Sequence, residues 1–273
     1  NSCAEAAFFC NSGAEANEAA IKLIRKYGSK ITNNKESIIL AAESSFHGRT
    51  FAALSATGQP KYHEGFEPLL SGFKFFKYND FGSVKNIFEE CEKRNQNIAG
   101  VLIEPIQGEG GVIPGNKKFF KQLREICNQK NSLLIFDEVQ SGVGRTGKMW
   151  GYENLDIEPD GFTLAKGLGG GHAIGALLVG KKANIFIPGD HASTFGGNPF
   201  ACTAALTILN EIKKKNLLHN VLMRSTQIEE GLSILAKKYS NIIIERRGIG
   251  LLQGIVLNDK LIDAKKIIIS AFD

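Results

Sequence analysis

The chain has 273 residues, of which 43% are hydrophobic and 22% are charged, an ordinary composition for a globular protein that buries a sizeable core. Its net charge of +5 is spread along predicted helices, and the densest basic run, Lys213–Lys215, lies near a helix end, so we expect no nucleic-acid partner. No apolar run approaches the length of a membrane span and no secretory signal is visible, so we expect no membrane partner and a cytoplasmic location.

Short β-branched or aromatic runs alternate with helical patterns along the chain. Strands are predicted over Ala7–Cys10, Ser37–Ala42, Phe73–Tyr78, Ile98–Glu104, Ser132–Asp137, Phe162–Ala165 and Ile174–Val179. Helices are predicted over Ala14–Tyr27, Val84–Glu92, Lys117–Gln129, Pro199–Lys213, Leu222–Lys238 and Asp263–Phe272. Near-continuous apolar strands separated by helices indicate an α/β fold, with a mostly parallel sheet covered on both faces.

The domain organisation follows from the later part of the chain. Residues 1–216 are predicted to form a large domain, and residues 217–273 a connecting helix and the start of a smaller domain. That smaller domain would begin with strands over Ile242–Arg246 and Leu251–Val256. Because the chain lacks an initiator methionine and stops inside a helical pattern, we expect it to be an internal piece of a longer protein.

The five cysteines are scattered and lack any Cys-x-x-Cys spacing, which is typical of reduced cytosolic thiols. The five histidines also lack the spacing of metal ligands. We therefore expect neither a disulfide framework nor a metal site.

The strongest chemical signal lies where two apolar strands end, at Asp137 and at Lys166. Charged groups at such places are costly unless something neutralises them, and in open α/β sheets ligands bind at the carboxyl ends of the strands. Pyridoxal phosphate would account for both, because its aldehyde needs a lysine and its ring nitrogen needs an acid. The two residues could instead form a buried salt bridge, but the glycines of Gly167–Gly171 suit a close approach to a bulky ligand.

Several loops could complete such a site. Ser12 can cap the next helix and Glu15 complete a capping box, which would leave the amides of Gly13 and Ala14 facing an anion. The alternative is a capped helix that binds nothing. Hydroxyl groups at Ser193 and Thr194, before a Gly-Gly turn, are suitable phosphate ligands but are also common in loops.

Other side chains around the strand ends have two readings. Phe46 could stack on a flat ring and Arg49 could bind a substrate carboxylate, although alone they would more often be a core residue and a surface charge. We leave His47 as structural. Glu104 could be a structural acceptor, and Glu109 could pair with a nearby arginine. After Asp137, an apolar side chain and an amide follow at Val139 and Gln140.

Taken in order, these motifs resemble the class III (subgroup II) aminotransferases of the pyridoxal-phosphate fold-type I superfamily, over essentially the whole chain. Within that family, they are most similar to the bacterial acetylornithine aminotransferases. The matching segments are Phe8-Phe-Cys-Asn-Ser-Gly-Ala-Glu-Ala-Asn17, Phe46-His-Gly-Arg49, Ala56-Thr-Gly-Gln-Pro-Lys-Tyr62, Gly65-Phe-Glu-Pro68 and Thr194-Phe-Gly-Gly-Asn-Pro199. The resemblance implies a fold-type I large domain and the start of a smaller C-terminal α+β domain.

The resemblance also implies roles at the cofactor. Lys166 would form the Schiff base and Asp137 would pair with the pyridine nitrogen, and these two are the expected catalytic residues. Val139 and Phe46 would sandwich the ring, and Gln140 would approach its phenolic oxygen.

Phosphate and substrate contacts follow in the same way. Gly13 and Ala14 would bind the phosphate, joined by Thr194 from the partner subunit of a homodimer. Arg49 would bind the substrate α-carboxylate with Ser193 nearby. The remaining expected contacts are Glu109 on the substrate side and Glu138 in the cofactor-binding set.

The implied reaction moves the terminal amino group of N-acetylornithine to 2-oxoglutarate, giving N-acetylglutamate semialdehyde and glutamate in arginine biosynthesis. Other class III donors stay open, namely ornithine, succinylornithine, succinyldiaminopimelate and 4-aminobutyrate. His172 departs from the family, which more usually has an apolar or aromatic residue there.

Two readings from other classes are a nucleotide-binding domain and a non-catalytic scaffold or incomplete, inactive fragment. The first lacks a Gly-x-Gly-x-x-Gly or Gly-Lys-Ser/Thr motif, and the second does not explain an intact Lys166 and Asp137.

Overall fold

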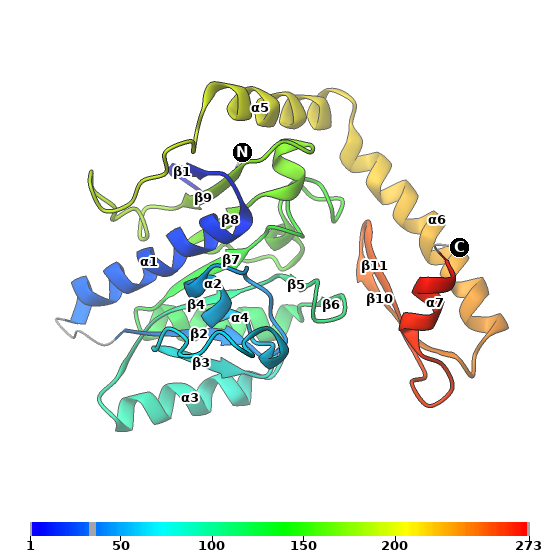
Figure 1. The fold of residues 1–273 in the computed structure, drawn as a ribbon, viewed down its shortest axis with the longest axis horizontal. Helices are drawn as coiled ribbons and strands as arrows, with labels where there is room; N and C mark the ends of the chain where they lie inside the picture. The colour runs from blue at the N-terminus through cyan, green and yellow to red at the C-terminus, as the bar shows by residue number, and fades with distance from the viewer. Residues whose placement is uncertain (1, 33–36, 272–273) are drawn as a thin grey trace.

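A seven-stranded sheet forms the centre of the molecule in the computed structural model, which describes residues 2–32 and 37–271 (Figure 1). The strand order is β1-β9-β8-β7-β4-β2-β3. The strands are β1 (Ala6–Cys10), β2 (Ser37–Ala42), β3 (Phe73–Phe76), β4 (Asn97–Ile103), β7 (Leu133–Asp137), β8 (Gly161–Leu164) and β9 (Gly175–Val179). Strand β9 is antiparallel to both β1 and β8, whereas the other pairs are parallel, so the predicted mostly parallel sheet is confirmed.

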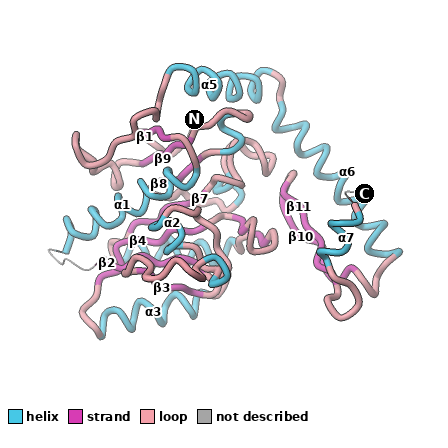
Figure 2. Tube along the Cα trace, viewed as in Figure 1, coloured by secondary structure: helices cyan, strands magenta, loops and turns pink. Residues whose placement is uncertain are grey.

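Helices cover both faces of this sheet, as Figure 2 shows. On one face lie α1 (Gly13–Thr32) and α2 (Phe51–Ala56), and on the other lie α3 (Phe81–Lys93) and α4 (Lys117–Gln129). The prediction missed α2, whose six residues are too few for a clear helical period. It also ended α1 too early, because Gly28 resembles a stop signal. In the structure a Cβ at that position would lie 2.2 Å from the Ser37 side chain, so Gly28 permits helix and strand to approach closely.

The sheet is buried by side chains that alternate between its two faces. In β7, Leu133 and Ile135 pack in the core under α1, whereas Leu134 and Phe136 pack in the core under α3 and α4. All four are fully buried. Because side chains along a strand alternate, Asp137 at the end of β7 falls on the α1 face. This register decides which side chains the Asp137 carboxylate contacts.

The C-terminal part of the chain leaves the sheet through two long helices, α5 (Pro199–Lys214) and α6 (Leu217–Lys238). The hairpin β10 (Ile243–Ile249) and β11 (Leu252–Leu257) follows, and then α7 (Ala264–Ser270), as predicted except that Phe272 lies outside the described residues. Figure 1 shows these last elements beside the sheet, and the Leu251 amide donates to the Arg145 carbonyl at 2.9 Å. The division into 1–216 and 217–273 stays a prediction.

Short elements complete the fold. They are β5 (Ile106–Gln107), β6 (Ile113–Pro114), and the 3₁₀ turns η1 (Pro60–Tyr62), η2 (Gly151–Asn154) and η3 (Lys166–Gly169). None of the helices in the described residues is both long enough and apolar enough to cross a membrane.

Candidate active site

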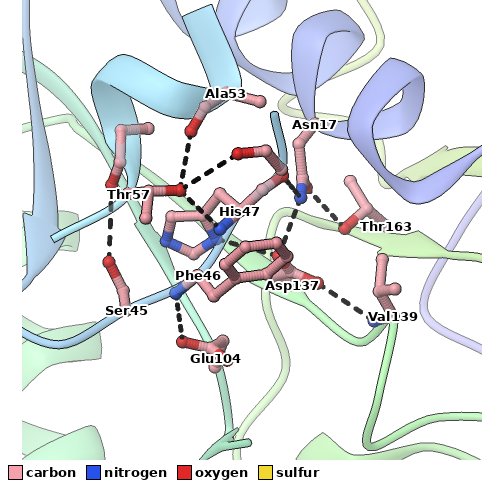
Figure 3. A network of polar contacts seen from close by, with 12 residues as sticks. Asn17, Ser45, Phe46, His47, Ala53, Thr57, Glu104, Asp137, Val139 and Thr163 are labelled. Atoms are coloured by element: carbon pink, nitrogen blue, oxygen red, sulfur yellow. Dashed lines mark hydrogen bonds and ion pairs between the residues drawn. The ribbon is translucent and has the colours of Figure 1, made fainter. Parts of the chain in front are cut away.

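Asp137 is held by hydrogen bonds from three parts of the fold (Figure 3). Its Oδ2 accepts from Asn17 Nδ2 of α1 at 2.7 Å and lies 2.8 Å from His47 Nδ1 in the loop after β2. Its Oδ1 accepts from the Val139 amide at 3.0 Å. The aspartate is only 4% exposed, so these contacts compensate for burial of its charge.

Asn17 is itself fixed at both ends of its side-chain amide. Its Nδ2 also donates to the His47 carbonyl at 2.7 Å, and its Oδ1 accepts from Thr163 Oγ1 at 2.8 Å. Thr163 pairs with Asp137 across β7 and β8, so it lies on the same face of the sheet. The network therefore fixes the direction of the Asp137 carboxylate before any ligand binds.

Asn17, which has no role predicted from the sequence, and His47, which is predicted to be structural, both contact the predicted catalytic aspartate. One signal could have found the asparagine. It is a buried polar residue in a helix whose neighbouring positions, Ala16, Ala19 and Ala20, are all buried alanines. No comparable sequence signal marks His47, because its contact depends on the path of a loop.

Lys166 follows β8 with a backbone φ of +42°, an uncommon conformation for a residue with a side chain. Such backbone strain is characteristic of functional sites. Partial desolvation of its amine lowers the pKa of Lys166, and the carboxylates of Asp137 and Glu109 oppose this. In the part of the chain that the structure describes, no salt bridge joins Lys166 to Asp137, so the alternative reading as an ion pair is not supported.

A cavity of about 510 Å³ lies between these groups. Residues of the predicted site that line it are Gly13, Ala14, Phe46, Arg49, Asp137, Val139, Gln140 and Lys166. The wall also includes Asn11, Asn17, His47, Glu104 and His172. The structure thus brings together, in one concave site, groups that are far apart in the chain, such as Gly13 and Lys166.

The N-terminus of α1 points its first amides at this cavity. Ser12 Oγ accepts from the Glu15 amide at 3.2 Å, as predicted. The expected capping box is wrong in one respect, because the Glu15 carboxylate accepts from the Asn11 amide at 2.9 Å instead of returning to Ser12. The amides of Gly13 and Ala14 have no acceptor within the helix, since the helix begins there. They are available to an anion.

Close packing narrows the cavity where the N-terminus of α1 meets Val139. A Cβ on Gly13 would lie 2.9 Å from both methyl groups of Val139, so only glycine fits beside that valine. Val139 therefore presents its side chain directly beside the first amides of α1.

The loop after β2 places Phe46 and Arg49 on the cavity wall. The Phe46 amide donates to Glu104 Oε2 at 3.2 Å, and the Gly108 amide donates to Glu104 Oε1 at 3.3 Å. Burial raises the pKa of Glu104 well above its usual range, and the charge of Asp137 acts in the same direction. Glu104 thus acts as the hydrogen-bond acceptor that the sequence suggested, joining two loops of the site.

Four predicted site residues do not line the cavity. Glu109 lies at its edge, where Gln140 Nε2 donates to Glu109 Oε1 at 3.4 Å. Ser193 Oγ accepts from Asn11 Nδ2 at 3.2 Å and so reaches the cavity only through that asparagine. Thr194 is exposed and has no contact with the cavity of its own chain.

Glu138 is the fourth, and its carboxylate is engaged elsewhere. It accepts from the Gly151 amide at 2.5 Å, from the Tyr152 amide at 2.7 Å and from Ser141 Oγ at 3.3 Å. Residue 138 alternates to the face opposite Asp137. Its side chain is 1% exposed and anchors the loop that returns through η2, so it supports the site without facing it.

The buried carboxylate of Glu138 predicts that the stability of the protein depends on pH. Burial raises the pKa of Glu138 to about 7, above its ordinary value of 4.5. Because the pKa of Glu138 is higher in the folded than in the unfolded protein, its contribution to the free energy of unfolding is fully present below about pH 4.5. This contribution is lost as the pH rises through about 7. We expect Glu138→Gln to reduce that loss, measured as the free energy of unfolding in urea at pH 5 and pH 8. The exposed Glu125→Gln is the control, and equal pH slopes for all three proteins would contradict the expectation.

A model of the family described as aminotransferase class-III matches residues 2–273 of the chain. The chain is 72% identical over 272 residues to an acetylornithine aminotransferase of Prochlorococcus marinus subsp. pastoris, a match that covers 100% of this chain and 66% of that protein. It is 52% identical over 259 residues to the acetylornithine aminotransferase of Synechocystis, covering 94% of this chain and 60% of that protein. The chain therefore spans slightly less than two thirds of the length of such relatives.

Solved structures are similar over the same range. The ornithine aminotransferase of Toxoplasma gondii matches with a TM-score of 0.90 and 30% identity, over 97% of this chain and 63% of that one. The N-acetylornithine aminotransferase of Stenotrophomonas maltophilia matches with a TM-score of 0.79 and 34% identity, over 98% of this chain and 64% of that one.

Proposed function

The chain belongs to the class-III aminotransferase family, and we propose on this premise that its full-length protein transfers the terminal amino group of N-acetylornithine to 2-oxoglutarate. Family membership confirms the resemblance and the fold-type I class predicted from the sequence. Enzymes of this family are transaminases that depend on pyridoxal phosphate. The products of the proposed reaction are N-acetylglutamate semialdehyde and glutamate.

The residues around the cavity fit this cofactor. The site offers a primary amine at Lys166, a fixed carboxylate at Asp137, and the free amides of Gly13 and Ala14 at the positive end of a 20-residue helix. These are the groups that an aldehyde, a ring nitrogen and a phosphate require. When bound, the cofactor supplies an electron sink for the carbon that carries the donor amine.

The protein's own groups would act as follows. Lys166 would hold the cofactor through its aldehyde and, once displaced by the donor amine, would move a proton at the amine-bearing carbon, a task that its lowered pKa favours. Asp137 would keep the ring nitrogen protonated, because Asn17 and His47 direct its carboxylate. Phe46 and Val139 would enclose the ring, and Gln140 would approach its phenolic oxygen.

The donor would be bound by Arg49, whose planar guanidinium matches a carboxylate. Ser193 and Glu109 lie at the edge of the cavity, where they would contact the rest of the donor. Glu138 would support the neighbouring loop instead of contacting the cofactor, since its carboxylate accepts from backbone amides.

We also propose a homodimer with shared active sites. Thr194 is exposed in the loop before α5, close in sequence to two exposed phenylalanines. Phe195 lies in that loop and Phe200 in the first turn of α5, and each is 72% exposed. Large apolar side chains so exposed favour an interface, and a second copy would receive Thr194 at its phosphate site. Sedimentation of the full-length protein tests this assembly.

The five cysteines are free thiols, which supports the proposed cytoplasmic location.

The observation that carries the proposed reaction is the convergence of Lys166, Asp137 and Arg49 on one cavity, in a chain 72% identical to an acetylornithine aminotransferase. The structural likeness to an ornithine aminotransferase favours ornithine as the second candidate donor. The test is the relative kcat/KM of the full-length holoenzyme for N-acetylornithine and for ornithine, with 2-oxoglutarate as acceptor. Preference for N-acetylornithine is expected, whereas preference for ornithine would replace the proposed donor.

A further inference from the structure

Arg49 is an exposed residue of the cavity wall that has no ionic partner among the described residues. It lines the cavity wall, and none of the salt bridges among the described residues includes it. Its Cζ instead lies 3.9 Å from the centre of the Tyr62 ring and 5.6 Å from the centre of the Phe46 ring. Both distances are within the range of a cation–π interaction. The aromatic rings thus hold the guanidinium while leaving its charge available.

The backbone on both sides of Arg49 is fixed. The preceding Gly48 has a φ of +136°, and a Cβ there would lie 2.8 Å from the Cβ of Ala14, so the loop packs tightly on α1. The following Thr50 donates from Oγ1 to Glu18 Oε1 at 2.6 Å. What stays adjustable is the long arginine side chain, and its direction therefore depends on the groups that it touches.

Tyr62 is itself held in place by the turn that carries it. It ends η1, and this turn is tied to the loop before Phe46 because the Gly58 amide donates to Ser45 Oγ at 3.0 Å. Gln59 Nε2 donates to the Ser45 carbonyl at 3.1 Å. The next residue, His63, places Nε2 2.7 Å from the Thr57 carbonyl. These hydrogen bonds hold the turn on which Tyr62 lies, and the tyrosine itself is half-buried.

The two aromatic rings also contact one another. The ring centres of Phe46 and Tyr62 lie 5.8 Å apart at an interplanar angle of 79°, an edge-to-face arrangement. Phe46 lines the cavity, whereas Tyr62 does not. The tyrosine thus acts on the site only through Arg49 and Phe46.

We propose that Tyr62 is a positioning residue that orients the Arg49 guanidinium and thereby selects amino donors that carry a carboxylate. The inference rests on the proposed function, since it assumes that Arg49 binds the donor carboxylate. It adds that the selectivity for that carboxylate depends on a residue outside the cavity wall. Removing the ring leaves the charge of Arg49 in place but allows the side chain to take directions away from the donor.

The test compares two donors on the full-length holoenzyme. N-acetylputrescine is N-acetylornithine without its α-carboxylate, so the ratio of kcat/KM for the two donors measures recognition of that group. Tyr62→Leu removes the ring, whereas Tyr62→Phe keeps it. The matched control is Lys61→Ala, which removes a second cation 4.7 Å from the same ring centre. Cofactor absorbance is recorded for every variant to show that its site is assembled.

We expect Tyr62→Leu to lower kcat/KM for N-acetylornithine about threefold to fivefold, through KM, and to leave N-acetylputrescine within about twofold. Tyr62→Phe and Lys61→Ala should keep the wild-type ratio. If Tyr62→Leu leaves the ratio of kcat/KM for the two donors unchanged, whether or not both values fall, the proposal is overturned.

Failure of the proposed function has a different signature. If the wild type does not use N-acetylornithine, the same comparison is made with ornithine and putrescine, and a ratio lowered by Tyr62→Leu still supports the role of Tyr62. A wild type that prefers neither carboxylated donor overturns the role of Tyr62 as well.

Discussion

Replacing Lys166 by alanine is expected to abolish transamination by the full-length protein. The variant loses both the amine that would hold the cofactor and the group that would move the proton, and loss of a positioned acid–base group alone costs about 10²- to 10⁴-fold in rate. Borohydride reduction followed by peptide mapping measures the loss of cofactor attachment, because the wild type should carry the cofactor on Lys166 and the variant should carry none. Turnover of N-acetylornithine measures the loss of catalysis.

Lys182 offers a matched control for this experiment. Desolvation lowers its pKa as it does for Lys166, but its amine donates to the Ser132 carbonyl at 2.8 Å, and it does not line the cavity. Lys182→Ala should therefore keep the label on Lys166 and the turnover per assembled site. Wild-type-like turnover in the Lys166 variant would refute the assigned site.

Asp137→Asn is expected to lower kcat by about 10²- to 10³-fold, the loss typical of removing one preorganised electrostatic group. Asparagine has nearly the same shape, so the cavity should persist while the negative charge beside the proposed ring position disappears. The bound cofactor should therefore show a pH titration of its visible absorption that differs from that of the wild type. This spectral change does not depend on turnover.

Asp160→Asn is the control for a merely structural effect. Asp160 is another largely buried carboxylate of the sheet region, paired with Arg124 at 2.9 Å and accepting from the Leu134 amide at 2.8 Å. Its replacement should lower the free energy of unfolding and leave the visible titration unchanged. A spectrum and kcat of the Asp137 variant equal to those of the wild type would show that this carboxylate does not face the cofactor.

Much of the fold was predictable because its elements are marked by local patterns. The apolar runs of β2, β4 and β7 have the length and β-branched content of buried strands, and the period of α4 matches its observed bounds. The ends of β7 and β8 also place Asp137 and Lys166 near one another, because the carboxyl ends of adjacent parallel strands share an edge. The helix α2 and the full length of α1 were missed where local signals were short or misleading.

The details of the site depended on contacts that no local pattern specifies. Glu138 was expected at the cofactor, but its side chain alternates away from Asp137 and binds the amides of Gly151 and Tyr152. The predicted capping box was shifted by one residue because the Glu15 carboxylate reaches the Asn11 amide. In both cases the residue type was informative, but the direction of the side chain was not.

The α/β class and the two charged groups at the strand ends could be predicted from composition and periodicity within short windows. The family was recognised from the resemblance of the motifs along the chain. The contacts of Asn17 and His47 with the Asp137 carboxylate, and of Tyr62 with the Arg49 guanidinium, became known only from the folded structure. These contacts of the carboxylate join residues 90 and 120 positions apart, so their geometry is set by loop paths and helix packing. Hydrogen bonds and ring contacts are sensitive to changes of a few tenths of an ångström in distance, which the order of residues along the chain does not specify.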